Sequence, residues 1–202
     1  MPVFVPVYVA IYEDGRMEIT MDEMKILEAI ADIDGIYNCG YVDTKDLVFR
    51  PEFRSLCEED TCGNYDVNYS CPPYCGTPEE MKAKVMQYKR LLVMQTAWDV
   101  SDVMNTEETK EVKAKHNDIS FKVLDELKAL GLESDAMMAG PCKQCKKMCM
   151  QMIGDPCPRD YKVYSCLSAY CLDVTALAET LGWECWCGNT RVLYFSLFMF
   201  EK

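Results

Sequence analysis

Cysteine is the residue that most constrains this chain, because twelve of its 13 cysteines fall into three groups of four. The first set is Cys57, Cys62, Cys71 and Cys75, the second set is Cys142, Cys145, Cys149 and Cys157, and the third set is Cys166, Cys171, Cys185 and Cys187. Four thiolates are what a tetrahedral zinc ion or a four-iron, four-sulfur cluster requires as ligands. The grouping therefore predicts metal sites, while the solitary Cys39 is expected to be a buried small residue.

A disulfide framework is the other common use of so many cysteines, and the rest of the sequence argues against it. The count is odd, and a chain of 202 residues with 50% hydrophobic residues can bury a core without cross-links. The amino terminus lacks the basic segment of a signal peptide, and the apolar run 192–200 is too short to cross a bilayer. We therefore expect a cytoplasmic protein without a membrane span, and exposed sulfur ligands would suit an anaerobe.

The charge balance is strongly acidic, with 33 acidic against 21 basic residues and a formal net charge of −12. Phosphate recognition depends on basic patches, so this balance argues against a nucleic-acid partner. It favours a partner with a basic surface. The expected partner is a redox protein, or a larger complex of which this chain is a subunit.

Local sequence patterns predict helices and strands in alternation. Helices are predicted over 21–33, 77–90, 106–130 and 173–181, strands over 91–98, 135–139 and 192–200, and a hairpin over 7–12 and 17–20. Thr20–Glu23 and Thr77–Glu80 have the spacing of capping boxes, and Gly131 and Gly182 are placed to end helices. The turn-rich stretch 34–76 carries the first set.

This alternation predicts an α/β (or α+β) fold with a single central mixed sheet flanked by helices. We expect one domain over residues 1–202. The cysteine-rich segments 57–75 and 142–187 are expected to form loops at one end of the sheet, which together make a metal-binding lobe.

The second set has the most specific spacing. Its cysteines are separated by two, three and seven residues, and Pro158 follows the last of them, as in ferredoxin-type runs. Steps of three and four would place the first three sulfurs on one face of a helical turn. Structural zinc more often uses two cysteine pairs that a longer spacer holds apart. The spacing favours an iron–sulfur cluster, with zinc and metal-free thiols as the alternatives.

The other two sets are looser. In the first set Cys75 lies just before a predicted helix start, where free amides would stabilise a thiolate-rich anion. Its alternative is a loop of buried thiols braced by Pro72 and Pro73. In the third set Trp183 and Trp186 would shield a third cluster from water, and the alternatives are redox-active thiols or small hydrophobic core residues.

Two further predictions concern charged and titratable groups. His116 is the only histidine, and its charged neighbours predict a solvated helix face. The isolation of His116 argues against a histidine-dependent triad, and a single histidine excludes a histidine-rich zinc site. Basic residues flank the second set and are expected to offset the negative charge of a cluster: Lys143, Lys146, Lys147 and Arg159.

Several motifs together resemble a known family. They are the segments 49–57, 62–65 and 70–73, followed by 139–145, Pro156-Cys157 and Asp173-Val174. In this order they resemble domain-of-unknown-function family 2284, prokaryotic proteins predicted to bind metal. The resemblance covers residues 40–182. It implies metal or iron–sulfur binding at Cys57, Cys62, Cys71, Cys142, Cys145, Cys149 and Cys157, and it implies no particular reaction.

The chain departs from the family pattern at several positions. Pro158 stands where the family usually has arginine, and Cys166 and Cys171 stand in place of a serine and a glycine. Cys75 is additional to the pattern, and Cys185 and Cys187 lie beyond the resemblance. The family's seven cysteines thus leave one of two sites short of a fourth protein sulfur unless Cys75 supplies it.

Taken together, the sequence predicts an iron–sulfur protein that binds two or three [4Fe–4S]-type clusters and transfers single electrons. The first and second sets are expected on one side of the sheet, since electron transfer requires neighbouring clusters. One alternative is an enzyme in which a cluster iron is open to substrate, and no catalytic residue is identified for it. The other is a zinc-stabilised protein-interaction module.

Overall fold

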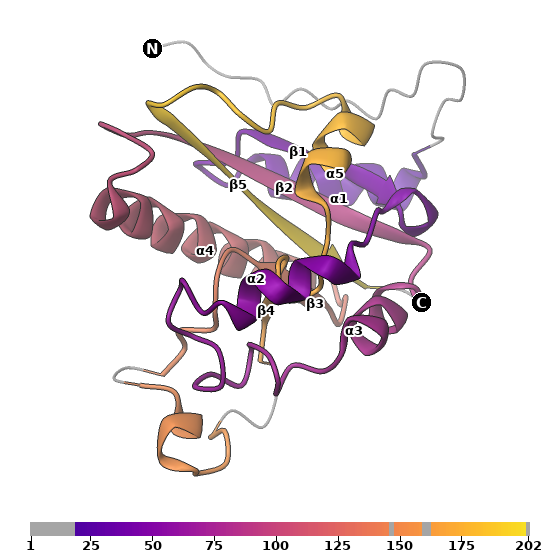
Figure 1. Cartoon of the computed structure of the whole chain (residues 1–202). Coiled ribbons are helices and arrows are strands. Elements are labelled where there is room, and N and C mark those ends of the chain that lie inside the picture. Colours follow the sequence, from indigo (N-terminus) through magenta and orange to yellow (C-terminus); the bar gives the residue numbers. More distant parts are fainter. Residues whose placement is uncertain (1–18, 146–147, 159–162, 201–202) are drawn as a thin grey trace.

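A computed structural model describes residues 19–145, 148–158 and 163–200. Within these ranges one sheet has the strand order β1-β2-β5-β3-β4 (Figure 1). Its strands are β1 (Asn38–Asp43), β2 (Arg90–Asp99), β3 (Asp135–Met138), β4 (Ser165–Cys166) and β5 (Arg191–Met199). Strands β3 and β4 are parallel, and the other neighbouring pairs are antiparallel. The mixed sheet confirms the predicted fold class, in its α+β form. The predicted hairpin lies outside the described residues, apart from its last two positions.

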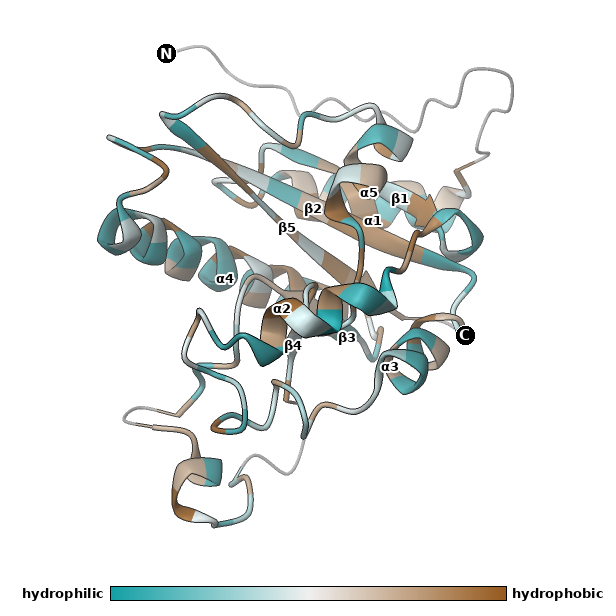
Figure 2. Ribbon diagram, in the orientation of Figure 1, coloured by the Kyte–Doolittle hydropathy of each residue, from teal (hydrophilic) through white to brown (hydrophobic). Residues whose placement is uncertain are grey.

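Helices cover both faces of this sheet. The α-helices are α1 (Met21–Ala31), α2 (Arg54–Glu58), α3 (Pro78–Val85), α4 (Thr106–Ala129) and α5 (Val174–Leu181), and the short 3₁₀ helices are η1 (Thr44–Asp46), η2 (Pro51–Phe53) and η3 (Met150–Ile153). Helices α1 and α4 share one apolar cluster with the sheet, and α3 and α5 share another. Successive residues of β2 alternate between the clusters, as the period of a strand requires: Leu91 and Val93 face α3 and α5, while Leu92 and Met94 face α1 and α4. Figure 2 shows the apolar stretches of β2 and β5 as brown bands.

The predicted helix ends are formed by the residues expected to form them. Thr20 and Glu23 make a complete capping box at the start of α1, and Thr77 and Glu80 make another at the start of α3. Gly182 ends α5 in the left-handed conformation at φ 65°, which favours glycine. These ends could be predicted because a few neighbouring residues determine each of them.

Three elements differ from their predicted form. Helix α3 ends at Val85 rather than near 90. The residues after Val85 form a turn instead, because the Thr44 hydroxyl donates to the carbonyl of Tyr88 and holds it there. Strand β1 lies within the stretch expected to be turns, and it is stabilised by pairing with β2 over its whole length. Strand β4 has only two residues, too few for a sequence pattern.

His116 is fully buried, so the prediction that it lies on a solvated face was wrong. Its Nδ1 atom lies 2.8 Å from the Thr96 hydroxyl and its Nε2 atom lies 2.9 Å from the Ser196 hydroxyl. Burial lowers its pKa to about 3, so the ring is neutral at pH 7. Val112 and Ile119, four residues before it and three after it, are also buried. The helical period thus places His116 on the inward face, despite its charged neighbours.

Candidate metal centres

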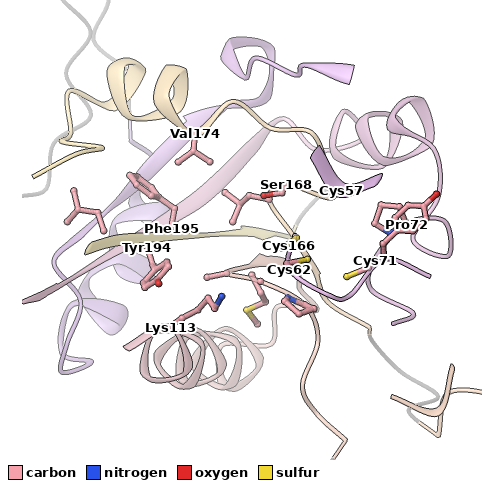
Figure 3. A pocket seen from close by; sticks show the side chains of 17 residues that line it. Cys57, Cys62, Cys71, Pro72, Lys113, Cys166, Ser168, Val174, Tyr194 and Phe195 are labelled. Carbon is pink, nitrogen blue, oxygen red and sulfur yellow. The ribbon is translucent and has the colours of Figure 1, made fainter. Parts of the chain in front are cut away.

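A cavity of about 380 Å³ lies at the carboxyl ends of β3 and β4, and we call it the sheet cavity. Its thiols are those of Cys57, Cys62, Cys71 and Cys166. Figure 3 shows Cys62, Cys71 and Cys166 toward one end, with Lys113, Tyr194 and Phe195 toward the other. Three of the four thiols belong to the first set, and the fourth comes from the third set.

Separate elements bring these thiols together. Cys57 lies in α2, Cys62 and Cys71 lie in the loop that follows, and Cys166 ends β4. The Arg54 guanidinium connects the two regions, because it donates to the carbonyl of Gly76 at 2.9 Å and to that of Ala169 at 2.9 Å. A side chain of α2 therefore fixes the first-set loop against the turn after β4.

The thiols of the sheet cavity affect one another electrostatically. Burial raises the pKa of the Cys57 thiol, and among its neighbours the charge of Cys166 adds the most to this rise. Burial raises the pKa of Cys71 to about 12, a rise that the hydrogen bond from Ser70 opposes and the charge of Cys166 reinforces. Cys57 and Cys71 are therefore protonated in the absence of metal, and metal binding would have to release their protons.

Cys166 has a backbone environment suited to a thiolate. Burial raises the pKa of its thiol, and the nearby backbone amides of Ala169 and Ser168 oppose the rise. Backbone amides near a ligand sulfur are among the features that stabilise iron–sulfur clusters and adjust their potential. The turn that supplies them continues to Cys171, which is buried at φ 55°, in the left-handed region that favours glycine. Cys171 stands where the family pattern has a glycine.

Cys75 lies at the margin of this group of thiols and does not line the sheet cavity. Its sulfur accepts from Arg54 Nη1 at 4.0 Å and contacts the carbonyl of Gly76 at 3.8 Å. Burial raises the pKa of its thiol, and the positive charge of Arg54 opposes the rise. It remains close enough for its charge to raise the pKa values of Cys71 and Cys166.

Lys113 extends from α4 into the sheet cavity (Figure 3). A Cβ atom at Gly140 would lie 3.3 Å from Cδ of this lysine, so the glycine provides the space in which the lysine stem lies. Burial lowers the pKa of Lys113 and the charge of Lys143 lowers it further, whereas Cys166 and Cys62, as thiolates, oppose that effect. The thiols are therefore the negative groups that act on this lysine once they lose their protons.

A second cavity, of about 530 Å³, is lined by all four cysteines of the second set, and we call it the loop cavity. Asn64, Asn68 and Lys143 also line it. The helical turn expected for the first three sulfurs is wrong for residues 141–145, which form no helix. The thiols line one cavity nevertheless, and η3 lies between Cys149 and Cys157. Lys146, Lys147 and Arg159 lie outside the described residues.

Hydrogen bonds join the two cavities directly. The Asn68 amide donates to the carbonyl of Cys142 at 3.0 Å, and the backbone amide of Cys142 donates to the Ser70 hydroxyl at 2.8 Å. The Ser70 hydroxyl in turn donates to Asn68 Oδ1 at 2.9 Å and lies 3.8 Å from the Cys71 sulfur. The first and second sets are therefore neighbours, as expected, at one end of the sheet.

The third set is divided between two places. Cys166 and Cys171 lie with the first set, whereas Cys185 and Cys187 lie in the loop from α5 to β5, at the opposite end of the molecule in Figure 1. The Cys187 thiol donates to Glu184 at 3.3 Å. Trp183 stacks on Phe195 with ring centroids 6.4 Å apart, but Trp186 is 67% exposed, so the expected shielding by Trp186 is wrong.

The donor sets of the two cavities fit a cluster in number and kind. Each cavity is lined by four thiols and no histidine. Among the described residues, no three His, Cys, Asp or Glu side chains converge closely enough to hold a single metal ion. A four-iron cluster is bound at four separate corners, so its ligands surround a space and do not meet at one point. Each cavity therefore fits a cluster because its four thiols surround a space and do not converge on one point.

Sequence reasoning missed three features of these sites: the position of Cys166, the contact of Lys113 and the Asn68–Ser70 connection. All three depend on contacts between residues far apart in the chain. One signal in the sequence could have indicated a role for Cys166. It and Cys171, only five positions apart, both replace residues of the family pattern.

In the described ranges, no helix has both the length and the apolar composition needed to cross a membrane.

Comparisons with known proteins agree with the cysteine chemistry. No curated protein and no solved structure shows significant similarity to the chain. A family described as predicted metal-binding protein (DUF2284) matches residues 40–200, which is most of the chain, so the protein belongs to this family of predicted metal-binding proteins.

Proposed function

We propose that this protein binds two [4Fe–4S]-type clusters, one in each cavity, and transfers single electrons. The observation that carries the proposal is the pair of adjacent cavities, each lined by four thiols and joined through Ser70 and Asn68. The clusters, when bound, would supply the one-electron chemistry.

The chain would contribute ligands, hydrogen bonds and charge. Four thiolates in each cavity would bind iron, after release of their protons. Gln144 donates to the Cys142 sulfur at 3.5 Å. A donor of this kind stabilises the reduced, more negative state of a cluster and so raises its potential. Lys113 would act in the same direction in the sheet cavity.

The proposal stops at two sites, because the structure divides the third set. Cys185 and Cys187 could form a third site only with ligands other than Cys166 and Cys171, which lie with the first set. The acidic surface, with a net charge of −12, favours a redox partner with a basic docking face.

Anaerobic purification with iron and acid-labile sulfide analysis tests the proposal. We expect iron and sulfide in equal amounts, enough for two clusters, and an electron paramagnetic resonance signal that grows on reduction. Two nearby reduced clusters would also broaden each other's signals. Zinc in stoichiometric amount without sulfide would contradict electron transfer and favour the zinc-stabilised interaction module.

An enzyme with an open cluster iron is a second candidate, and the shape of the sheet cavity favours it. Beyond the thiols the cavity continues along an apolar wall that includes Val174, Leu193 and Phe195. Its volume of about 380 Å³ falls within the range of small-molecule sites. An open iron requires that only three thiols bind the cluster, so the fourth ligand of this site distinguishes the two candidates.

A further inference from the structure

The first site has an unresolved fourth ligand, for which the chain offers two thiols. The family resemblance implies Cys57, Cys62 and Cys71 at this site, and the order of the sequence suggests Cys75 as the fourth. The structure offers Cys166 instead, which lines the same cavity as the other three.

We propose that Cys166, and not Cys75, supplies the fourth sulfur of the sheet cavity. The assignment rests on the proposed function for the identity of the metal, but the choice of thiol rests on geometry alone. Cys166 would then connect β4 to the first-set loop through the metal, across about a hundred residues of sequence.

Cys166 is placed by the sheet so that it lines the sheet cavity. It ends β4, whose carboxyl end opens into the cavity, and Figure 3 shows it beside Cys62. Cys166 therefore lies with Cys57, Cys62 and Cys71 around one space, which Cys75 does not line.

The contacts of the Cys75 sulfur give the second reason for the assignment. The Cys75 sulfur is already in contact with Arg54 and with the carbonyl of Gly76, and it lines neither cavity. Cys75 is better explained as part of the contact that Arg54 makes with the first-set loop.

Two alanine variants test the assignment, because alanine cannot bind metal. We expect Cys166→Ala, purified anaerobically, to lose half of the iron and sulfide of the wild type or to show the signal of a three-iron cluster. We expect Cys75→Ala to keep the full content and an unchanged spectrum. Circular dichroism and the denaturation midpoint of the metal-free proteins would show that both variants fold.

Full iron and an unchanged spectrum in Cys166→Ala would overturn the assignment. A loss in Cys75→Ala as large as that in Cys166→Ala would overturn it equally. If the wild type holds zinc in place of iron and sulfide, electron transfer fails, but zinc counts on the same variants still decide the ligand. A Cys142→Ala background, in which only the first site should fill, gives a second measurement, since adding Cys166→Ala there should remove the remaining metal.

Discussion

The two cavities gather their thiols in different ways. The loop cavity takes all four from the continuous segment 142–157, whereas the sheet cavity takes three from 57–71 and, in our assignment, the fourth from β4. A local set is visible in the spacing of the sequence, but a set that spans the fold depends on which strands pair. The thiols of the loop cavity therefore come from one short segment, while those of the sheet cavity come together only in the folded sheet.

Removal of one loop-cavity thiol should test this difference most strongly. We expect Cys142→Ala to lose half of the iron and sulfide while the signal of the sheet cavity remains, because the sheet still holds its own ligands. Iron and sulfide counts with electron paramagnetic resonance measure both quantities. Cys187→Ala is a matched control, since this thiol lies at the far end of the molecule, and it should keep the full content. Loss of all iron in Cys142→Ala would show that the two sites do not fill independently.

Acid should lower the free energy of unfolding through His116 at a higher pH than that at which carboxylates become protonated. The pKa of His116 is about 3 in the folded state and about 6.5 when unfolded, so between these values the unfolded state binds more protons. Stability should therefore fall as the pH drops below about 6.5, by up to about 1.4 kcal/mol per pH unit, until the pH nears 3.

Denaturant unfolding of the metal-free protein between pH 7 and 5 measures this slope. His116→Gln should be less stable at pH 7 but should show a flatter pH dependence over the same range. An equal slope in the variant would assign the acid sensitivity to other groups.

The hydrogen bonds between the cavities should have a smaller effect. We expect Ser70→Ala to reduce the free energy of unfolding by about 1–3 kcal/mol, because it leaves the Cys142 amide without its acceptor and removes one of the two hydrogen bonds from Ser70 to Asn68 Oδ1. Chemical denaturation measures the change. Ser55→Ala is the control, since its hydroxyl bonds to Glu52 at an exposed position and its loss should cost less than about 0.5 kcal/mol. Equal effects of the two variants would argue against a structural role for Ser70.

A charge change inside the sheet cavity should have the smallest effect and should be confined to one site. We expect Lys113→Gln to lower the reduction potential of the sheet-cavity cluster and to leave the loop-cavity cluster nearly unchanged. A redox titration followed by electron paramagnetic resonance separates the two. Lys115→Gln removes the same charge from the same helix, but this lysine is half-exposed and paired with Glu111 at 2.7 Å, so it should shift neither potential measurably. Equal shifts in both variants would indicate a general surface-charge effect.

The sequence predicted the elements that depend on neighbouring residues. Helices α1, α4 and α5 begin and end close to the expected positions, because caps, glycines and helical periodicity are local signals. Strand β1 and the burial of His116 were missed, because strand pairing and packing override local polarity. The same limit applies to the sites. The second set could be grouped from its spacing, but the proximity of Cys166 to Cys57 and Cys71 follows only from the position of β4 in the sheet.

The Ser70 hydroxyl has a consequence for how charge would move through the protein. It lies 3.8 Å from the Cys71 sulfur and accepts a hydrogen bond from the backbone amide of Cys142, so a single hydrogen bond connects the residues that we propose as ligands of the two sites. Tunnelling through covalent and hydrogen bonds is far more efficient than tunnelling across empty space. With both sites filled, an electron would thus have a continuous bonded route through the interior, and the partner protein would need to approach only one of the two.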